Sequence, residues 1–267
     1  ARRPAGAGAG GPSAYPPPAR GAQPPARGPA CADLLAGAGV ARVVAGCEDP
    51  DPRTAGRGLA RLRAAGIEVQ AGPGEDEASA SLAGYLMRMA EGRPYVTLKL
   101  AMSLDGRIAT AEGESRWITG DAARRHGHLL RARSDMILVG RGTYEADDPK
   151  LDVRIEGLED RSPRRALLSR SGAPDGWEHV PAPEAIAGLE GVNDLLVEGG
   201  AGAAAAFLAA DLVDRLFLYR APVILGAGRD AVGDIGLRRL AEAHGRWRPA
   251  ESRMLGPDRL EIYARLR

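Results

Sequence analysis

A short apolar strand that runs into glycines and then into a helix is the feature that most constrains how this chain can fold. Leu195–Val197 is such a strand, since Glu-Gly-Gly and the Ala-rich segment Ala201–Ala210 follow it directly. Met136–Val139 runs in the same way into Gly140-Arg-Gly-Thr143. Buried strands that alternate with helices are typical of a sheet with helices packed on its faces. The pattern therefore predicts an α/β domain over Arg93–Arg267.

The other regular segments of this region fit the same fold class. Tyr95–Met102 alternates in polarity, so that Lys99 and Ala101 share one face of the predicted strand and the leucines share the other. The remaining predicted elements are a helix at Asp121–Arg133 and strands at Leu216–Leu225 and Leu260–Leu266. No internal repeat is evident, so we expect one domain rather than a repeat array.

The residues before Arg93 divide into three parts. In residues 1–30, Ala, Gly, Pro and Arg fill 27 positions and no Leu, Ile, Val or Phe is present, which predicts a disordered tail. A frameshift or misassigned start and a natural low-complexity tail both account for this composition. Residues 31–74 are predicted to form a βαβ-like fragment and residues 75–92 a connecting helix. The predicted elements are helices at Ala32–Ala38, Arg57–Ala65 and Glu75–Glu91 and strands at Val40–Ala45 and Ile67–Ala71.

The composition limits the classes of function. The formal net charge is +1, so no general affinity for nucleic acid is expected. The two cysteines make no disulfide framework and fit a reducing compartment. No apolar run is long enough to cross a membrane, and the N-terminal residues lack the apolar core of a secretory signal. We therefore expect a cytoplasmic protein that neither binds membranes nor crosses them.

The two glycine turns have two interpretations. Glycine lets a backbone approach a ligand closely, and helix N-terminal N–H groups attract anions, so the turn at Glu198–Gly202 suits a dinucleotide pyrophosphate. The same turn can be a tight strand-to-helix connection that packs for its own sake. It lacks the GxGxxG motif of Rossmann folds. The second glycine turn, where Thr143 can cap a helix or contact a phosphate, favours an extended phosphate-bearing ligand.

Four charged side chains are candidates for chemistry. Lys99 lies within an otherwise apolar strand, where a lysine either serves a ligand or lies in solvent on an edge strand. Glu198, at the mouth of a buried strand, either caps nearby N–H groups or contacts a ligand. Arg131 and Arg154 are candidates for holding a phosphate, because the guanidinium geometry matches phosphate oxygens.

Other polar residues are interpreted as structural. His126 and His128 are two positions apart on a predicted helix and point to different sides, so they are poor metal co-ligands and are predicted to be surface residues. Asp147-Asp-Pro149 contains two carboxylates, but the proline favours a plain turn over a metal site.

Five motifs after Arg93 occur in the order found in one enzyme family. They are Tyr95-Val-Thr-Leu-Lys-Leu-Ala-Met-Ser-Leu-Asp-Gly-Arg107, Gly113-Glu-Ser-Arg-Trp-Ile-Thr119, Leu130-Arg-Ala-Arg133, Asp147-Asp-Pro149 and Val197-Glu-Gly-Gly200. Over Arg93–Arg267 the sequence resembles the reductase half of the bifunctional riboflavin biosynthesis deaminase–reductase family. The resemblance implies a dihydrofolate-reductase-like fold and a homo-oligomer such as a dimer. It also implies NADPH-dependent reduction of the ribose of 5-amino-6-(5-phosphoribosylamino)uracil to a ribityl chain.

The resemblance further implies roles for individual residues. The implied cofactor contacts are Ala101, Trp117, Thr143, Asp147, Ser169, Gly200, Ala201, Gly202, Ala203, Ala204, Ala205 and Ala206. The implied substrate contacts are Lys99, Ser115, Thr119, Arg131, Leu151, Arg154 and Glu198. We expect Lys99 and Glu198 to lie nearest to the chemistry. The sequence departs from the family at Leu168, where an Asp is common, and Arg165–Val192 is short for the family.

The part before Arg93 resembles the C-terminal half of the partner deaminase, which has a cytidine-deaminase-like fold. The motifs are Cys31-Ala-Asp-Leu-Leu, Arg42-Val-Val-Ala, Asp49-Pro-Asp-Pro-Arg53 and Gly56-Arg-Gly58. Such deaminases hold zinc with a His and two Cys and use a Glu as proton shuttle. Cys31 matches the second Cys, but Ala22 stands where the first is expected, and the His-x-Glu segment has no counterpart. One thiolate cannot hold a catalytic zinc, so we expect neither zinc nor deaminase activity.

Two other functions compete with a reductase that works alone. One is a complete bifunctional deaminase–reductase of which this sequence lacks the true N-terminus. An intact His-Ala-Glu and Pro-Cys in another upstream reading frame would favour it. The other is a non-catalytic nucleotide-binding module, against which the retained Lys99 and Glu198 argue.

Overall fold

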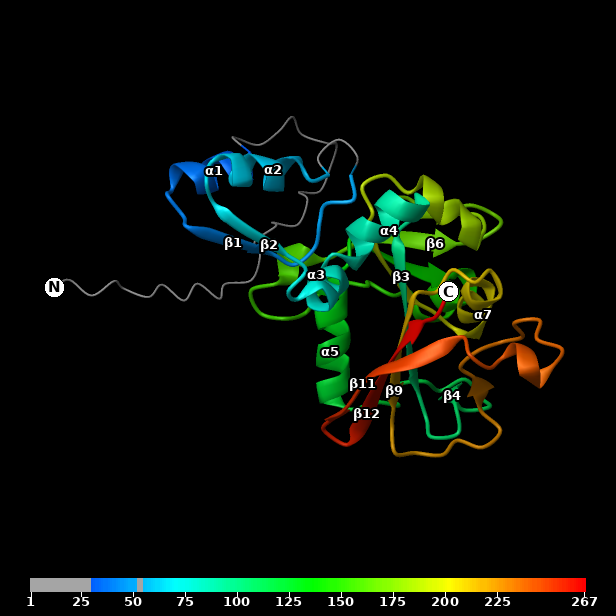
Figure 1. The fold of residues 1–267 in the computed structure, drawn as a ribbon. Coiled ribbons are helices and arrows are strands. Elements are labelled where there is room, and N and C mark those ends of the chain that lie inside the picture. Colours follow the sequence, from blue (N-terminus) through cyan, green and yellow to red (C-terminus); the bar gives the residue numbers. More distant parts are fainter. Residues whose placement is uncertain (1–29, 52–54) are drawn as a thin grey trace. The chain divides into compact units, whose positions relative to one another are not determined.

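The structure is a computed structural model that describes residues 30–51 and 55–267. The chain divides into two compact units, Ala1–Ala90 and Glu91–Arg267, called unit 1 and unit 2 below (Figure 1). The division at Glu91 lies two residues before the domain start predicted at Arg93. The tail predicted to be disordered, residues 1–30, lies outside the described residues except for its last position.

Unit 1 contains the βαβ arrangement predicted from the sequence. β1 (Arg42–Ala45) and β2 (Glu68–Ala71) pair in parallel, and α2 (Arg57–Ala64) makes the crossover that a parallel pair requires. α1 (Cys31–Gly37) precedes them. The buried apolar residues of its core are Ala32, Leu62 and Ile67.

The helix predicted at Glu75–Glu91 is two helices in the structure, so that prediction is wrong at its centre. α3 (Glu75–Ser81) and α4 (Ala83–Glu91) are separated at Leu82, where φ is −104° and ψ is 10°. The Ser81 hydroxyl donates to the carbonyl of Ala78 at 3.0 Å. A serine bonded in this way competes with the helical hydrogen bonds and favours a break.

Unit 2 is built on one mixed sheet of eight strands in the order β11-β12-β9-β3-β8-β5-β6-β7. The strands are β3 (Tyr95–Met102), β5 (Met136–Gly140), β6 (Arg164–Leu168), β7 (Glu178–Val180), β8 (Asp194–Glu198), β9 (Arg215–Arg220), β11 (Trp247–Leu255) and β12 (Asp258–Arg265). The strands from β9 to β7 run parallel, whereas β12 and β11 are antiparallel to their neighbours. β4 (Arg107–Ala109) and β10 (Arg229–Asp230) form a separate short ladder. The predicted α/β class is confirmed.

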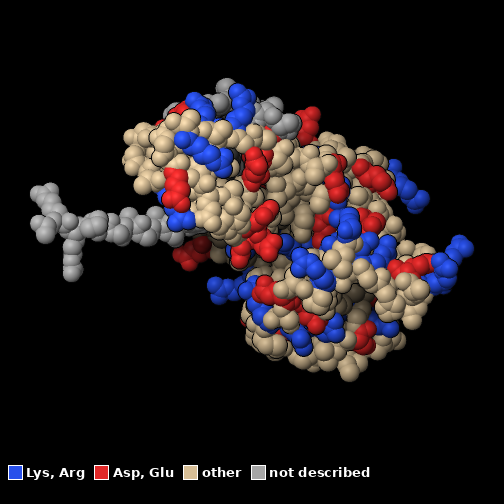
Figure 2. Space-filling model, in the orientation of Figure 1, with Lys and Arg blue, Asp and Glu red and all other residues tan. Residues whose placement is uncertain are grey.

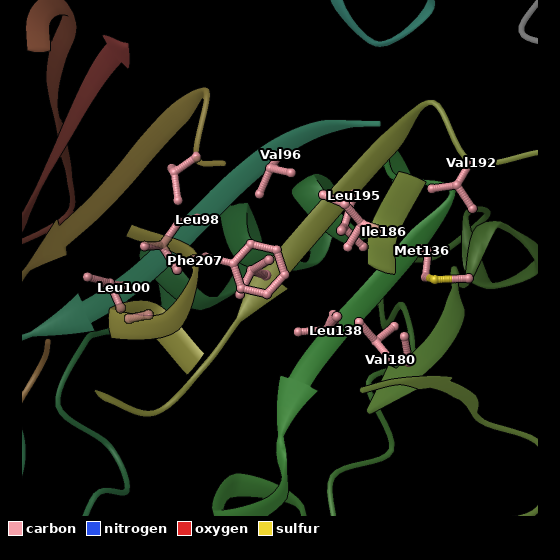
Figure 3. Packing of buried hydrophobic residues seen from close by; sticks show 14 of the residues in the cluster. Val96, Leu98, Leu100, Met136, Leu138, Val180, Ile186, Val192, Leu195 and Phe207 are labelled. Atoms are coloured by element: carbon pink, nitrogen blue, oxygen red, sulfur yellow. The ribbon is translucent and has the colours of Figure 1, made fainter. Parts of the chain in front are cut away.

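Helices cover both faces of this sheet. On one face, Phe207 of α7 (Ala201–Ala209) packs into the largest core cluster, among Leu98, Leu138 and Leu195 (Figure 3). On the other face, α5 (Asp121–Ala132) packs against clusters that contain Phe217, Tyr219 and Leu196. The shorter helices are α6 (Arg141–Asp147), η1 (Glu159–Arg161), η2 (Pro183–Gly188) and η3 (Leu240–Glu242). The alternation of β3 therefore sends its apolar side chains toward α7 and Lys99 toward α5.

The structure corrects several predicted strands. The strand predicted at Leu216–Leu225 ends at Arg220, because Pro222 has no N–H to donate to a ladder. β6 and β7 were not among the predicted strands, and β7 has only three residues. β11 was also missed, because it is exposed along most of its length and so carries no apolar alternation.

The composition predicts neither a membrane span nor a strongly charged surface. Among the described residues, no helix is both long and apolar enough to cross a membrane. Basic and acidic side chains are interspersed on the face of unit 2 that Figure 2 shows, which matches a net charge of only +1. The absence of nucleic-acid binding stays an expectation.

A half-buried carboxyl at the amino end of β8 makes stability depend on pH. Burial and then the charge of Asp135, opposed by Arg215, raise the pKa of Asp194 to about 6. The unfolded value is about 4, so ionisation of Asp194 destabilises the folded state progressively as pH rises from about 4 to 6 and fully above that. Asp194→Asn should therefore raise the free energy of unfolding at pH 8 by at most about 2–3 kcal/mol.

This prediction is checked by urea unfolding followed by tryptophan fluorescence, which reports on unit 2 because Trp117, Trp177 and Trp247 all lie there. The gain should largely vanish at about pH 3, where both states bind the proton. An equal gain at both pH values would contradict the role assigned to ionisation.

Candidate active site

Lys99 and Glu198 lie side by side on two neighbouring strands, with Glu198 at the carboxyl end of β8 and Lys99 in the middle of β3. They are register partners in the parallel pair β3–β8, and Lys99 Nζ lies 3.6 Å from Glu198 Oε2. Because β3 lies between β8 and β9, Lys99 is on a central strand, and the edge-strand alternative is wrong. The local sequence that puts Lys99 here is the alternation of β3, which turns its side chain toward α5.

Arg131 on α5 holds the Glu198 carboxylate in a two-point ion pair. Its Nε donates to Oε1 at 2.7 Å and its Nη2 donates to Oε2 at 2.9 Å. Its Nη1 donates to the carbonyl of Asp152 at 3.0 Å. Burial raises the pKa of Glu198, but the charges of Lys99 and Arg131 outweigh this and lower it to about 2. Glu198 is thus ionised and interacts with two cations. All three guanidinium nitrogens of Arg131 donate hydrogen bonds within the protein.

Lys99 has a charged and an aromatic neighbour but no hydrogen bond to any other residue that the structure describes. Its Nζ lies beyond hydrogen-bond distance of Glu198 and 5.8 Å from the centroid of the Tyr219 ring. The side chain is 21% exposed. All three N–H groups of the ammonium can therefore donate to a ligand. A cation held in this partly dry position can stabilise a developing negative charge or supply a proton.

Two histidines and a tyrosine lie around this cluster, and sequence reasoning missed them. His126 and His128 are half-buried, so their prediction as surface residues is wrong, although they do point to different partners. His126 Nδ1 lies 2.6 Å from the hydroxyl of Tyr219, and His128 Nδ1 lies 3.1 Å from the carbonyl of Asp152. Burial, with nearby arginine charges, lowers the pKa of both imidazoles. The spacing of His128 and Arg131, three apart on one helix face, was the available signal.

The two glycine turns meet at the same edge, because β5 and β8 are neighbours in the sheet. The backbone N–H of Gly200 donates to Thr143 Oγ1 at 3.0 Å and so joins the turns. A Cβ on Gly199 would lie 2.8 Å from the Cβ of Ala203, and one on Gly140 would lie 3.2 Å from it. These two glycines thus allow α7 to pack closely on the sheet, as the packing interpretation requires.

The first turn of α7 is the part of this edge that remains available to a ligand. The backbone N–H groups of Ala201, Gly202 and Ala203 bond to none of the described residues, and no side chain caps the helix. Gly202 is exposed, and a Cβ built on it would meet nothing within 4 Å. Uncapped N–H groups at a helix N-terminus can bind an anion.

An open cavity of about 470 Å³ lies beside α6. It is lined by Gly113, Glu114, Ser115, Arg116, Glu145, Ala146, Asp147 and Asp148. The cavity brings Ser115, an expected substrate contact, next to Asp147, an expected cofactor contact. Arg116 Nη2 donates to the carbonyl of Asp147 at 3.4 Å and connects the two sides. Asp147 ends α6, and Asp148 follows with a φ of 40°, so the predicted turn is present.

Three of the other expected substrate contacts differ in exposure. Arg154 is 64% exposed, and its Nε lies 3.4 Å from a carboxylate oxygen of Asp152. Thr119 and Leu151 are buried, at 8% and 5% exposure. Leu151 packs into the core beneath α5 with a φ of 55°, so only its backbone can reach a ligand.

The expected cofactor contacts also divide into accessible and buried groups. Trp117 is 66% exposed, and the guanidinium of Arg124 lies 4.6 Å from its ring centroid. Ser169 is buried and accepts hydrogen bonds from Arg141 at 2.8 and 3.2 Å. Ala101 and Ala206 are half-buried, whereas Ala204 and Ala205 are buried in the packing of α7. Ala204 has no exposed area, so a ligand would reach it only through the backbone of its neighbours.

Comparison with known proteins agrees with this fold. The family described as RibD C-terminal domain matches residues 94–260. The riboflavin biosynthesis protein RibD of Escherichia coli is 38% identical, over 87% of this chain and 76% of its own length. The RibD of Mycobacterium tuberculosis is also 38% identical, over 87% of this chain and 72% of its own. The Acinetobacter baumannii RibD structure superposes with a TM-score of 0.79 at 33% identity, covering 89% of this chain and 76% of that one.

A mixed α/β sheet with a Lys–Glu–Arg cluster at its carboxyl edge, in a chain matched by these proteins, defines a reductase of riboflavin biosynthesis. The chain belongs to the RibD family, and unit 2 contains the RibD C-terminal domain. The resemblance inferred from the five sequence motifs is confirmed.

Proposed function

We propose that unit 2 reduces the ribose of 5-amino-6-(5-phosphoribosylamino)uracil to a ribityl chain, with NADPH as the hydride donor. The observation that carries the proposal is the ammonium of Lys99, fully available to donate and held beside the ionised pair of Glu198 and Arg131. A Thermotoga maritima structure described as a deaminase and 5-amino-6-(5-phosphoribosylamino)uracil reductase supports it, with a TM-score of 0.76 at 27% identity over 88% of this chain and 74% of that one.

The residues at the carboxyl edge fit NADPH. The uncapped N–H groups of Ala201–Ala203 would hold its pyrophosphate, and exposed Gly202 leaves room for the backbone to approach it. Thr143, which already joins the two glycine turns, would lie beside the same group. When bound, NADPH supplies a hydride to C1′ of the opened ribose.

Lys99 would donate a proton, or hold positive charge, at the atom where negative charge develops during that reduction. Glu198 would keep the ammonium in place and could also bind the pyrimidine. Arg131 holds Glu198 through two hydrogen bonds. We therefore propose that Arg131 positions Glu198, rather than binding the substrate phosphate. Arg154, largely exposed, remains the candidate for the substrate phosphate.

The direct test is NADPH oxidation by the purified chain with the deaminated pyrimidine substrate. Substrate-dependent loss of NADPH absorbance, with formation of the ribityl product, would establish the activity. A chain that binds both molecules without hydride transfer would be the non-catalytic module considered above.

Gly202→Val should weaken NADPH binding at least about tenfold without lowering the melting temperature. A branched side chain there meets no protein atom but covers the N–H groups that would hold the pyrophosphate. Gly200 is a poorer test, because its Cβ would lie 3.0 Å from Thr143 Oγ1 and would disturb the turn itself. Gly188→Val is the control, since it has the same open surroundings but precedes β8. Equal loss in both variants, measured by isothermal calorimetry, would refute the assignment.

Arg154→Ala should raise the Michaelis constant for the phosphorylated substrate by about fivefold to tenfold and leave turnover nearly unchanged. That corresponds to a charge-assisted contact of about 1–1.5 kcal/mol, reduced by solvent exposure. The substrate without its phosphate is the control and should show little effect. An equal rise for both substrates would mean that Arg154 has a structural role.

We also propose that unit 1 is a partial deaminase-like domain without catalytic zinc. The curated relatives match 87% of this chain, which is more than unit 2 alone contains, so the similarity extends into unit 1. Cys31 and Cys47 are the cysteines of the chain, and neither lies in a group of metal-ligating side chains within the described residues. One zinc per chain together with ammonia release from the diaminopyrimidinone precursor would favour the bifunctional alternative.

A further inference from the structure

The aromatic ring of Tyr219 lies next to the Lys99 ammonium. Tyr219 lies on β9, is the register partner of Ala101 on β3, and is 1% exposed. Its ring centroid lies 5.8 Å from Lys99 Nζ, within the range where an ammonium is attracted to the face of an aromatic ring. No other aromatic ring in the described part of the chain lies within such a distance of Lys99.

The ring of Tyr219 is itself held from α5 by His126. The hydroxyl lies 2.6 Å from His126 Nδ1, and the imidazole stacks on Phe217 with ring centroids 6.4 Å apart. Arg253 Nη2 lies 2.8 Å from His126 Nε2, and a guanidinium only donates, so Nε2 is the acceptor. Nδ1 then carries the imidazole hydrogen and donates to Tyr219. Burial and the charges of Arg253 and Arg133 lower the pKa of His126, which keeps it in this neutral form.

Lys99 needs such a support because Glu198 alone would not fix it. The Glu198 oxygens already accept two short hydrogen bonds from Arg131, while Lys99 lies 3.6 Å away. A lysine has four rotatable side-chain bonds, so without a second contact its ammonium would turn fully onto the carboxylate. A lysine engaged in that way would have fewer N–H groups for the substrate.

We propose that Tyr219 is a positioning residue for Lys99, and that its ring, anchored by His126, keeps the ammonium beside Glu198 but available to the substrate. This inference rests on the proposed function, because it assigns Lys99 to the reduction of the ribose. The aromatic face carries the effect, and the hydroxyl serves to orient the ring.

Three substitutions separate the ring from the hydroxyl and from the fold. Tyr219→Phe keeps the ring and should retain turnover within about threefold of wild type. Tyr219→Leu removes it and should lower turnover on the order of tenfold, with the dissociation constant for NADPH unchanged. Pentafluorophenylalanine at position 219 keeps the shape but withdraws charge from the ring face, and should lower turnover as Leu does. This third variant keeps the test valid if the leucine variant fails to fold.

A readout that needs no catalysis follows from the composition, because the chain has only two lysines, Lys99 and Lys150. Protein grown with lysine labelled with carbon-13 at the ε position should give two ε-methylene signals, and Lys150→Arg identifies the exposed one. The Lys99 protons should be shifted upfield by the ring current in wild type and Tyr219→Phe, and this shift should disappear in Tyr219→Leu.

The two measurements distinguish the possible failures. If the Lys99 signal is the same in wild type and Tyr219→Leu, or if the leucine and pentafluoro variants both turn over like wild type, the inference is wrong. A fall in turnover together with a weaker NADPH affinity would indicate a general structural role and would also overturn it. If wild type shows the ring-current shift but no reduction of the substrate, the proposed function fails instead.

Discussion

Replacing Lys99 with methionine is expected to lower turnover by at least about a hundredfold while NADPH affinity stays close to that of the wild type. Methionine keeps an unbranched stem of similar length and removes the charge. The hydride added to C1′ leaves negative charge that must be neutralised, and Lys99 is the cation of the cluster whose donors are all available. Arg131 keeps its two hydrogen bonds to Glu198 in the variant, so the carboxylate does not lose its partner.

Lys150→Met is the matched control, since it removes the chain's other lysine from an exposed position. Steady-state turnover at saturating substrate and calorimetric NADPH binding are the two measurements. If Lys99→Met leaves turnover unchanged and raises only the Michaelis constant, Lys99 is a binding residue and the catalytic role is wrong.

The position of Lys99 was predictable because strand alternation is a local property. The eight-residue period-two pattern of β3 fixes which side chains share its face, and the structure reproduces it residue by residue. The partners of Lys99 were not predictable in the same way. That Glu198 lies beside it depends on the register between β3 and β8, which are separated by about ninety residues of chain, and on their place at the centre of the sheet.

The placement of α5 explains why the two histidines were wrongly predicted to lie on the surface. From sequence, the face of an amphipathic helix that carries polar residues is expected to meet water. Here the polar side chains of α5 point toward the sheet and the loop after α6, so Arg131, His126 and His128 are half-buried against Glu198, Tyr219 and Asp152. The buried charges of Arg131 and Glu198 are tolerated because they pair with each other. This pairing depends on the tertiary structure, which local sequence patterns do not encode.

The glycine turns show a mixture of both interpretations that the sequence left open. Gly140 and Gly199 are required by the close approach of Ala203, which is packing. Gly202 has no such neighbour and lies in an uncapped first turn, which is the part that suits an anion. A sequence pattern cannot separate these roles, because the distance of each Cβ position from the adjoining elements decides them.

The largest effect on stability is expected from a buried ion pair at the other end of β3. Asp214, 3% exposed, accepts two hydrogen bonds from Arg93, at 2.8 and 3.0 Å, and one from the backbone N–H of Val96, at 2.7 Å. Arg267 also donates to it. Burial lowers the pKa of Arg93, but the hydrogen bonds and charge of Asp214 outweigh this and raise it. The pair thus joins the starts of β3 and β9 to the C-terminal residue.

Asp214→Asn should lower the free energy of unfolding of unit 2 by about 3 kcal/mol, because it removes the buried counter-charge of Arg93 and leaves that guanidinium paired only with the half-exposed carboxylate of Glu91, at 2.8 Å. The matched control is Asp211→Asn, which removes the charge from an equally bidentate pair with Arg265, at 2.7 and 3.0 Å, whose carboxylate side chain is 44% exposed. Arg265 is only 9% exposed, but its Nη1 also donates to the carbonyls of Arg246 and Leu266, and the Asp211 carboxylate is already partly solvated. The loss should therefore be smaller, about 1–2 kcal/mol. Asparagine also tolerates the φ of 54° at position 211.

Urea unfolding followed by tryptophan fluorescence measures both variants at pH 7. Equal losses would show that burial of the carboxylate does not set the contribution of these pairs.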